Sequence, residues 1–340
     1  MSPTEVHADV EENEWASRLR SRLSGMAEEM LVPGGVVLVR SADHGDLTMT
    51  FGTRTREGDD PVQLGDHIRV GSNTKTWTGT VVLQLAQEEL LELDDPIGRY
   101  RPGVPNGDNI TIAQLLAMRS GLYNYTETVE MNRILDDDPA YVFEPEELLA
   151  MAFAHKNYCE PGVRFHYSNT NTVLLGLLIE QLAGSVHDEF AKRIFEPLEM
   201  HDTVMPERAS AAIPRPYARG YMYGTNLSTI STQVLPKAQQ AEAMAGTLKP
   251  YDQTDGSPSW AWTAGGGIST AGDLLRYVVA LVNGRLLDEP AQQARMASLQ
   301  PRDPEDPDGP AYGYALARFG TFYGHTGELP GYNSFMGHDP

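Results

Sequence analysis

The fold is decided by residues 68–85, which read IRVGSNTKTWTGTVVLQL. The stretch begins with a short strand-like run and Gly71, and the next two residues, Ser72 and Asn73, are types that start helices. Apolar side chains then recur every four residues, at Trp77, Val81 and Leu85. This spacing predicts an apolar helix with one face buried.

Ser72 and Lys75 lie one turn apart at the head of this helix. A serine hydroxyl becomes nucleophilic when a base removes its proton, and a lysine whose pKa is lowered can act as that base. The same spacing also arises from an ordinary N-cap serine beside a surface lysine, and chance alone gives roughly 0.25 copies of S-x-x-K in such a chain. The pair therefore needs support from other motifs.

The composition indicates a globular chain with enough apolar residues for a large hydrophobic core. Its 340 residues are 41% hydrophobic, which suits one large domain. The chain has 26 basic and 47 acidic residues, a net charge of −21, which repels phosphate backbones and anionic membrane surfaces. We expect no nucleic-acid or membrane partner. No metal-binding pattern occurs, and no cofactor is predicted.

Cysteine and leader patterns indicate an intracellular setting. Cys159 is the only cysteine, so no internal disulfide can form. Residues 1–15 lack the basic and apolar regions of a secretory signal, and no apolar run is long enough to cross a bilayer. We expect a cytoplasmic protein, or a secreted one if a leader was removed.

Periodicity divides the chain into strand-like ends and a helical middle. Helices are expected at 15–30, 144–154, 171–182, 187–195, 271–282 and 288–299, with a shorter one after Thr111. Strands are expected at 36–40, 47–51, 68–70, just after Trp260, and at 312–319, 321–326 and 332–337, with a loop at 301–310.

This order predicts an α+β fold, an antiparallel β-sheet flanked by helices with an inserted all-helical lobe. We expect a single domain over 1–340. An α/β lobe would comprise about 13–70 and 260–340, the helical lobe about 71–205, and a loop-rich insertion about 206–259.

Two further motifs follow Ser72 and Lys75 in a fixed order: Tyr167-Ser168-Asn169 and His325-Thr326-Gly327. Each is short, but the three motifs in this order are expected by chance only about 0.002 times. The set resembles the penicillin-recognising serine acyltransferases, which include DD-peptidases, class C β-lactamases, esterases and D-aminopeptidases. The motif sequences are most similar to those of the serine D-alanyl-D-alanine carboxypeptidases with an HTG motif.

The resemblance implies a role for each motif residue. Ser72 would be the nucleophile, and either Lys75 or Tyr167 would take its proton. Asn169 would bind the substrate amide. Thr326 and Gly327 would bind the substrate carboxylate or the side of the substrate that carries the leaving group. The backbone N–H groups of Ser72 and Glu328 would form the oxyanion hole.

Four positions add detail to this site. Trp260 and Arg318 resemble pocket residues, with Arg318 as an anion partner or, equally, a surface charge on a strand. Position 328 carries a glutamate where the family usually has a small residue. This carboxylate puts in doubt how well the site tolerates a substrate carboxylate. His325 stands where most of the superfamily has lysine, so a catalytic group titrating near pH 6.5 is expected.

The leading hypothesis is a serine hydrolase that forms an acyl-enzyme on a peptide carbonyl next to a D-residue, with a small peptide, ester or β-lactam as substrate. A peptide cyclase or thioesterase, an esterase, and a non-catalytic binding protein on the same fold remain alternatives. The family's last strand and C-terminal helix have no counterpart before Pro340. A partner chain or further domain is therefore expected to cover that sheet edge.

Overall fold

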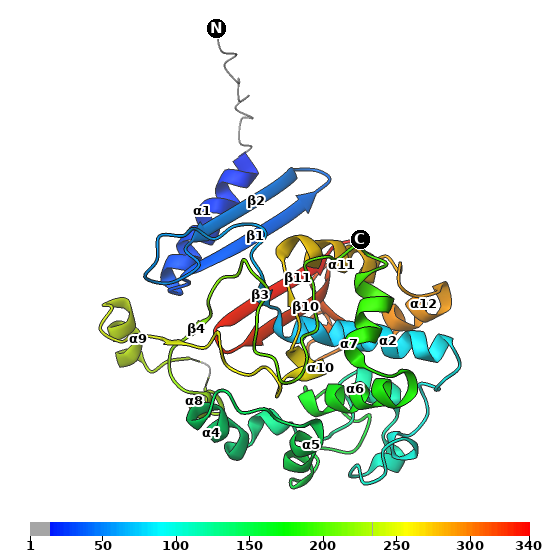
Figure 1. The fold of residues 1–340 in the computed structure, drawn as a ribbon. Coiled ribbons are helices and arrows are strands. Elements are labelled where there is room, and N and C mark those ends of the chain that lie inside the picture. Colours follow the sequence, from blue (N-terminus) through cyan, green and yellow to red (C-terminus); the bar gives the residue numbers. More distant parts are fainter. Residues whose placement is uncertain (1–13, 233) are drawn as a thin grey trace.

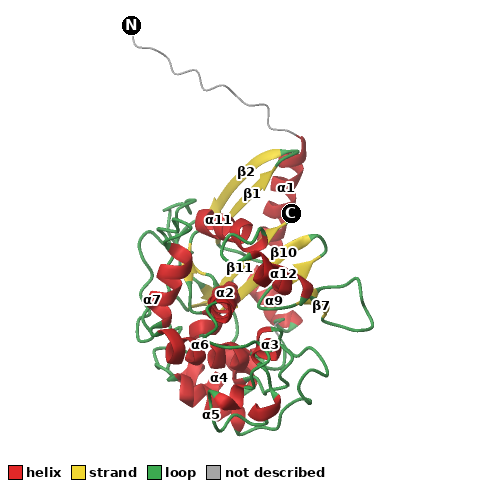
Figure 2. Cartoon of the chain, turned by 90° about the vertical axis from the view of Figure 1, so that its right-hand side faces the viewer, coloured by secondary structure: helices red, strands yellow, loops and turns green. Residues whose placement is uncertain are grey.

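The computed structural model describes residues 14–232 and 234–340 and confirms the α+β class. Most of the opening segment examined for a secretory signal lies outside the described residues. Figure 1 shows α2 (Thr74–Gln87) running through the middle of the molecule, with the helical lobe on one side and β10 and β11 toward the other. Figure 2 shows β1, β2 and α1 at one end and α4 and α5 at the opposite end.

The central helix differs from its prediction in two respects. Ser72 lies on a 3-10 turn, Gly71–Asn73, that precedes α2, and neither Ser72 nor Asn73 caps the helix with its side chain. All residues from Thr74 to Leu83 are buried, so α2 is enclosed on every face rather than on one. Hydroxyls make this possible, because those of Thr76 and Thr80 bond to backbone carbonyls.

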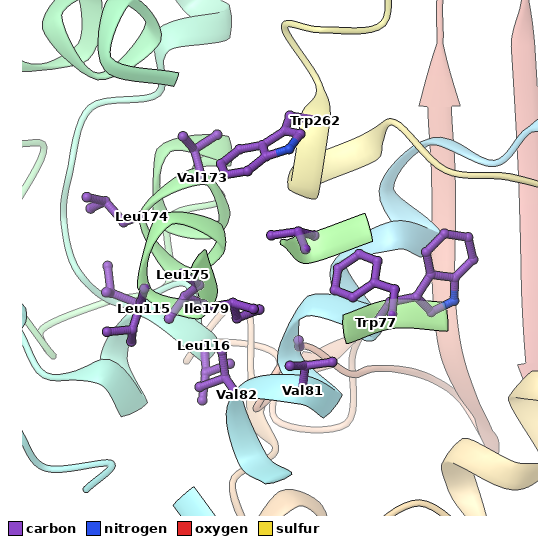
Figure 3. Packing of buried hydrophobic residues seen from close by; sticks show 14 of the residues in the cluster. Trp77, Val81, Val82, Leu115, Leu116, Val173, Leu174, Leu175, Ile179 and Trp262 are labelled. Atoms are coloured by element: carbon purple, nitrogen blue, oxygen red, sulfur yellow. The ribbon is translucent and has the colours of Figure 1, made fainter. Parts of the chain in front are cut away.

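The helical lobe packs against α2 through branched apolar side chains. Its main helices are α3 (Ile112–Leu116), α4 (Val129–Asp137), α5 (Pro145–Phe153), α6 (Asn169–Ala183) and α7 (Val186–Phe190), which continues into a π-helical turn, Ala191–Phe195. Figure 3 shows Val81 and Val82 of α2 facing Leu116 of α3 and Ile179 of α6. This core holds the nucleophile segment rigidly.

The main sheet has five antiparallel strands in the order β11-β10-β9-β8-β7. Its strands are β7 (Gln300–Pro301), β8 (Ala311–Tyr312), β9 (Ala317–Phe319), β10 (Phe322–Leu329) and β11 (Tyr332–His338). The single strand expected at 312–319 is therefore two strands. A reversal at Ala315, whose φ is +51°, separates them.

The N-terminal strands form a two-stranded sheet of their own, and α11 (Ala271–Val282) contacts both this sheet and β11. Helix α1 (Glu14–Glu29) packs on a hairpin of β1 (Gly34–Ser41) and β2 (Gly45–Gly52), where Trp15 stacks on His44. Helices α11 and α12 (Glu289–Ala297) match their predicted ranges closely. In α11 the Thr270 hydroxyl accepts from the Asp273 backbone, which fixes the helix start.

Two regions differ from expectation. The run after Trp260 forms a short helix, α10 (Trp262–Gly265), before the two-residue strand β6 (Ile268–Ser269), which pairs with β3 (Ile68–Arg69). The insertion at 206–259 contains regular elements, namely β4 (Tyr221–Met222), α8 (Asn226–Thr229), α9 (Lys237–Met244) and β5 (Tyr251–Asp252). Local periodicity missed them because each is short.

A groove of about 2510 Å³ runs from between β1 and β11 to the region of Ser72 and Asn169. Within the described part of the chain, β11 pairs with β10 alone, and its other edge faces this groove. The expected covering of that edge stays a prediction. No helix among the described residues is long and apolar enough to cross a membrane.

Candidate active site

Two glycines bring the nucleophile turn against strand β10. Gly71 has a φ of +53°, a conformation that favours glycine, and a Cβ there would lie 2.5 Å from the backbone nitrogen of Glu328. A Cβ at Gly327 would lie 1.9 Å from the carbonyl oxygen of Val70. The close approach places the Ser72 turn directly beside the Glu328 peptide. This is the pair of backbone groups expected to form the oxyanion hole.

Lys75 is fully buried and holds three contacts. Its Nζ lies 2.9 Å from Ser72 Oγ, 2.6 Å from Asn169 Oδ1 and 2.6 Å from the carbonyl oxygen of Ala264. No carboxylate contacts Lys75 within the described ranges, and burial lowers the pKa of its amine well below the usual value. The site thus favours a neutral amine.

The acceptors around Lys75 decide where its lone pair points. The Ala264 carbonyl can only accept, and Asn169 presents its Oδ1 because its Nδ2 donates to Thr126 Oγ1 at 3.1 Å. In its charged form Lys75 donates to all three oxygens, Ser72 Oγ included. In its neutral form it has two N–H bonds, which the Ala264 and Asn169 oxygens take. Its lone pair is then left for the Ser72 hydroxyl proton.

Tyr167 lies on the other side of the nucleophile. Its hydroxyl hydrogen bonds with Ser72, and the Lys75 Nζ lies 4.9 Å from the centre of its ring. Burial raises the pKa of the Tyr167 phenol, more than the Ser72 hydrogen bond lowers it. Tyr167 therefore keeps its proton near neutral pH.

Asn169 is positioned by residues that the sequence reading did not single out. Its backbone N–H donates to Asn124 Oδ1 at 3.0 Å, and its Nδ2 reaches Thr126. Asn124 and Thr126 come from the segment 119–126, more than forty residues earlier. The signal available was the similarity of RSGLYNYT to the family, which marked the segment but assigned it no role.

His325 is buried, and its tautomer is set by its neighbours. Nδ1 lies 2.5 Å from the Thr326 carbonyl oxygen, which can only accept, so Nδ1 carries the proton and Nε2 accepts from Tyr312 Oη at 3.0 Å. Burial lowers the pKa of His325 to about 3. The expected titration near pH 6.5 is therefore wrong, because a desolvated imidazole stays neutral.

The remaining predicted residues take different positions. Trp260 and Glu328 line the groove with Ser72 and Asn169. On β10, Thr326 is exposed and Gly327 is buried. Arg318 lies on β9, donates to the Gly309 carbonyl at 3.3 Å and does not line the groove. Within 14–232 and 234–340, no group of three or more His, Cys, Asp or Glu residues could hold a metal ion.

Comparison with known proteins identifies the family of this chain. Residues 13–340 match the family model described as beta-lactamase. The chain is 27% identical over 305 residues to penicillin-binding protein 4* of Bacillus subtilis, covering 88% of this chain and 64% of the relative. It is 31% identical over 185 residues to protein flp of Staphylococcus aureus, and this match covers 51% of this chain and 34% of protein flp. The chain thus spans less than two thirds of these relatives.

Solved structures resemble it over most of their length. A D-stereospecific amidohydrolase from Streptomyces sp. superposes with a TM-score of 0.74 at 31% identity, covering 91% of this chain and 88% of that one. The D-amino acid amidase from Ochrobactrum anthropi SV3, complexed with D-phenylalanine, superposes with a TM-score of 0.75 at 27% identity. The match covers 95% of this chain and 88% of the amidase. The chain belongs to the beta-lactamase family.

Proposed function

We propose that the protein hydrolyses amide bonds on the carbonyl side of a D-residue through an acyl-enzyme on Ser72. The proposal is supported by the arrangement around Lys75 and by the similarity to a D-stereospecific amidohydrolase and a D-amino acid amidase. The observation that carries it is the burial of Lys75 between two oxygens that can only accept, with Ser72 as its third contact.

The first step forms the acyl-enzyme. Neutral Lys75 takes the proton of the Ser72 hydroxyl as Oγ attacks the substrate carbonyl carbon. The developing oxyanion is stabilised by the backbone N–H groups of Ser72 and Glu328, which the close approach at Gly71 brings together. Lys75 would then be the base, which the motifs alone left open between Lys75 and Tyr167.

The second step breaks the carbon–nitrogen bond. The leaving nitrogen needs a proton, and Tyr167 is suited to deliver it because its raised pKa keeps the phenol protonated beside Ser72. The proton on Lys75 then returns to the phenolate oxygen of Tyr167, whose ring centre lies 4.9 Å from the Lys75 Nζ. Water releases the D-acyl group and regenerates Ser72.

The same acyl-enzyme on Ser72 also fits reactions with other leaving groups and other acyl acceptors. A D-alanyl-D-alanine carboxypeptidase, an esterase, and a peptide cyclase or thioesterase differ in what leaves and what attacks, not in Ser72 chemistry. The non-catalytic alternative is disfavoured, because the contacts of Ser72 with both Lys75 and Tyr167 are intact.

The test compares five substrates on wild type and Ser72→Ala: a D-amino acid amide, its L-enantiomer, a D-alanyl-D-alanine peptide, a short-chain ester and a peptidyl thioester. Intact-mass spectrometry with a phosphonate should show one adduct on wild-type Ser72 and none on Ser72→Ala, with circular dichroism unchanged. Labelling of another serine, or turnover by the alanine variant, would refute the assignment. Equal turnover of D- and L-amides would refute the stereochemistry.

A further inference from the structure

Arg295 is a buried cation with unpaired hydrogen-bond donors. Its side chain lies on α12 and is 1% exposed. Its Nη2 donates to Thr80 Oγ1 at 2.9 Å, whereas Nε and Nη1 have no hydrogen-bond partner within residues 14–232 and 234–340. Buried polar groups in folded proteins are generally hydrogen-bonded, because an unpaired donor loses its contacts with water. Two nitrogens of Arg295 therefore lack the acceptor that burial requires.

The guanidinium keeps its charge in this environment. Burial lowers the pKa of Arg295 to about 10, which is still well above neutral pH. None of the ion pairs in the described part of the chain includes Arg295. The phenol of Tyr277 acts on the pKa of Arg295, but burial raises the pKa of that phenol, so Tyr277 stays neutral. The described residues thus give this buried cation no counter-charge, which is strongly destabilising.

Three helices meet at this charge. Thr80 belongs to α2, Tyr277 to α11 and Arg295 to α12. The Tyr277 side chain is fully buried, and its hydroxyl has no hydrogen-bond partner in the described ranges. The hydroxyl protons of Thr76 and Thr80 are already donated to backbone carbonyls. The phenol O–H is therefore a further unpaired donor near the guanidinium.

The neighbouring amide side chains do not supply the missing acceptor. Gln84 lies one turn beyond Thr80 on α2, and Gln292 lies one turn before Arg295 on α12. Each amide nitrogen donates to a backbone carbonyl oxygen, at 2.8 Å for Gln84 and at 2.9 Å for Gln292, which fixes the orientation of both amides. Their Oε1 atoms accept from no group in the described part of the chain. A neutral amide oxygen would also leave the charge of Arg295 unbalanced.

We infer that Arg295 and Tyr277 bind a small monovalent anion, chloride in ordinary buffers, at the junction of α2, α11 and α12. One negative charge balances the single guanidinium, and hydrogen bonds to a charged donor are stronger than those between neutral groups. Thr80, Tyr277 and Arg295 are at most 1% exposed, and this enclosure favours a monatomic ion over a bulkier anion. The ion would join the helix that carries Lys75 to α11 and α12.

The proposed ion site is separate from the catalytic site. Neither Arg295 nor Tyr277 lines the groove that contains Ser72. The anion site is therefore independent of the proposed function, and its tests measure stability and binding rather than turnover.

Urea unfolding at constant ionic strength, with chloride exchanged for gluconate, tests the site in solution. An ion that binds only the folded protein stabilises it by mass action. For wild type, the unfolding free energy should rise with the logarithm of chloride concentration, with the slope of one ion released on unfolding. Arg295→Met removes the charge and should abolish this dependence. Arg285→Met, which changes an exposed arginine between α11 and α12, is the matched control and should retain it.

A second variant covers the case in which Arg295→Met does not fold. Tyr277→Phe keeps the guanidinium and the aromatic ring and removes only the phenol donor. It should weaken chloride binding three- to tenfold in the same titration. A chloride dependence that is identical in wild type, Tyr277→Phe and any folded Arg295→Met would be a general salt effect and would overturn the proposal.

Crystals of the wild type grown in sodium bromide locate the ion directly. Diffraction data at the bromine absorption edge should show an anomalous peak within hydrogen-bond distance of Arg295 Nε or Nη1. A solvent peak there without anomalous signal would show that water alone satisfies these donors, and the anion site would be wrong. A bromide peak without any chloride dependence in solution would mean binding at crystal concentration only and would equally overturn the site.

Discussion

The Nζ atom of Lys75 lies 2.9 Å from the Oγ atom of Ser72, and the lysine side chain is completely buried. Removing an amine from water lowers its pKa, and no carboxylate among residues 14–232 and 234–340 contacts Lys75 to oppose that shift. One relationship therefore supplies both the proximity and the protonation state that a general base needs.

The first prediction concerns the pH dependence set by Lys75. Because the base acts in its neutral form, kcat/KM should fall about tenfold per pH unit once the solution is more acidic than the lowered pKa of Lys75. In Lys75→Arg, kcat/KM should fall at least about 1000-fold, since a guanidinium stays protonated. The measurement is kcat/KM against pH on a D-amino acid amide. Substantial activity in Lys75→Arg would show that deprotonation of this residue is not needed.

The second prediction treats Lys75 and Tyr167 as one proton relay. Lys75→Ala and Tyr167→Phe should each lower turnover by several orders of magnitude, and the double variant should be little worse than the poorer single one. Both side chains contact Ser72, so loss of either interrupts the same path. Single-turnover rates of acylation test this. Losses that multiply in the double variant would mean independent roles.

The third prediction concerns His325 and acid stability. Its pKa is about 3 in the fold and about 6.5 in the unfolded chain, so below pH 6.5 the unfolded state binds a proton that the folded state does not. Stability should fall from pH 6.5 toward pH 3, by about 2 kcal/mol at pH 5 from this group.

Urea unfolding of wild type and His325→Gln at pH 8 and pH 5 measures this effect. The glutamine variant should lose less stability between the two values, while its kcat/KM keeps the same acidic limb, because that limb belongs to Lys75. A limb that disappears in His325→Gln would show that the imidazole is the group being titrated.

The fourth prediction concerns the close approach at Gly327. A Cβ there would lie 1.9 Å from the Val70 carbonyl oxygen, so Gly327→Ala must move β10 away from the Ser72 turn. Overpacking of this kind costs roughly 1–3 kcal/mol, and the displaced Glu328 N–H should lower kcat by about 100-fold. Gly65→Ala is the control, because nothing lies within 4 Å of its added Cβ. Equal kcat in the two variants would contradict the role of Glu328.

Sequence alone marked the three motif residues that lie together in the fold and predicted much of the secondary structure. The motif residues Ser72, Lys75 and Tyr167 do meet, and the ranges expected for α11 and for the β1–β2 hairpin agree with the structure. These features are local, since periodicity, helix caps and turn residues act over a few positions. Short elements such as α8, α10 and β7 carry too few residues for such patterns.

Tertiary structure decided the chemistry at those residues. Which of Lys75 and Tyr167 is suited to be the base, and whether His325 titrates, depend on desolvation and on partners such as the Ala264 carbonyl and Tyr312. The position of Asn169 likewise depends on Asn124 and Thr126, which reach it from a segment more than forty residues earlier. A side chain's pKa follows from all the groups packed around it, and these come together only when distant parts of the chain fold against one another.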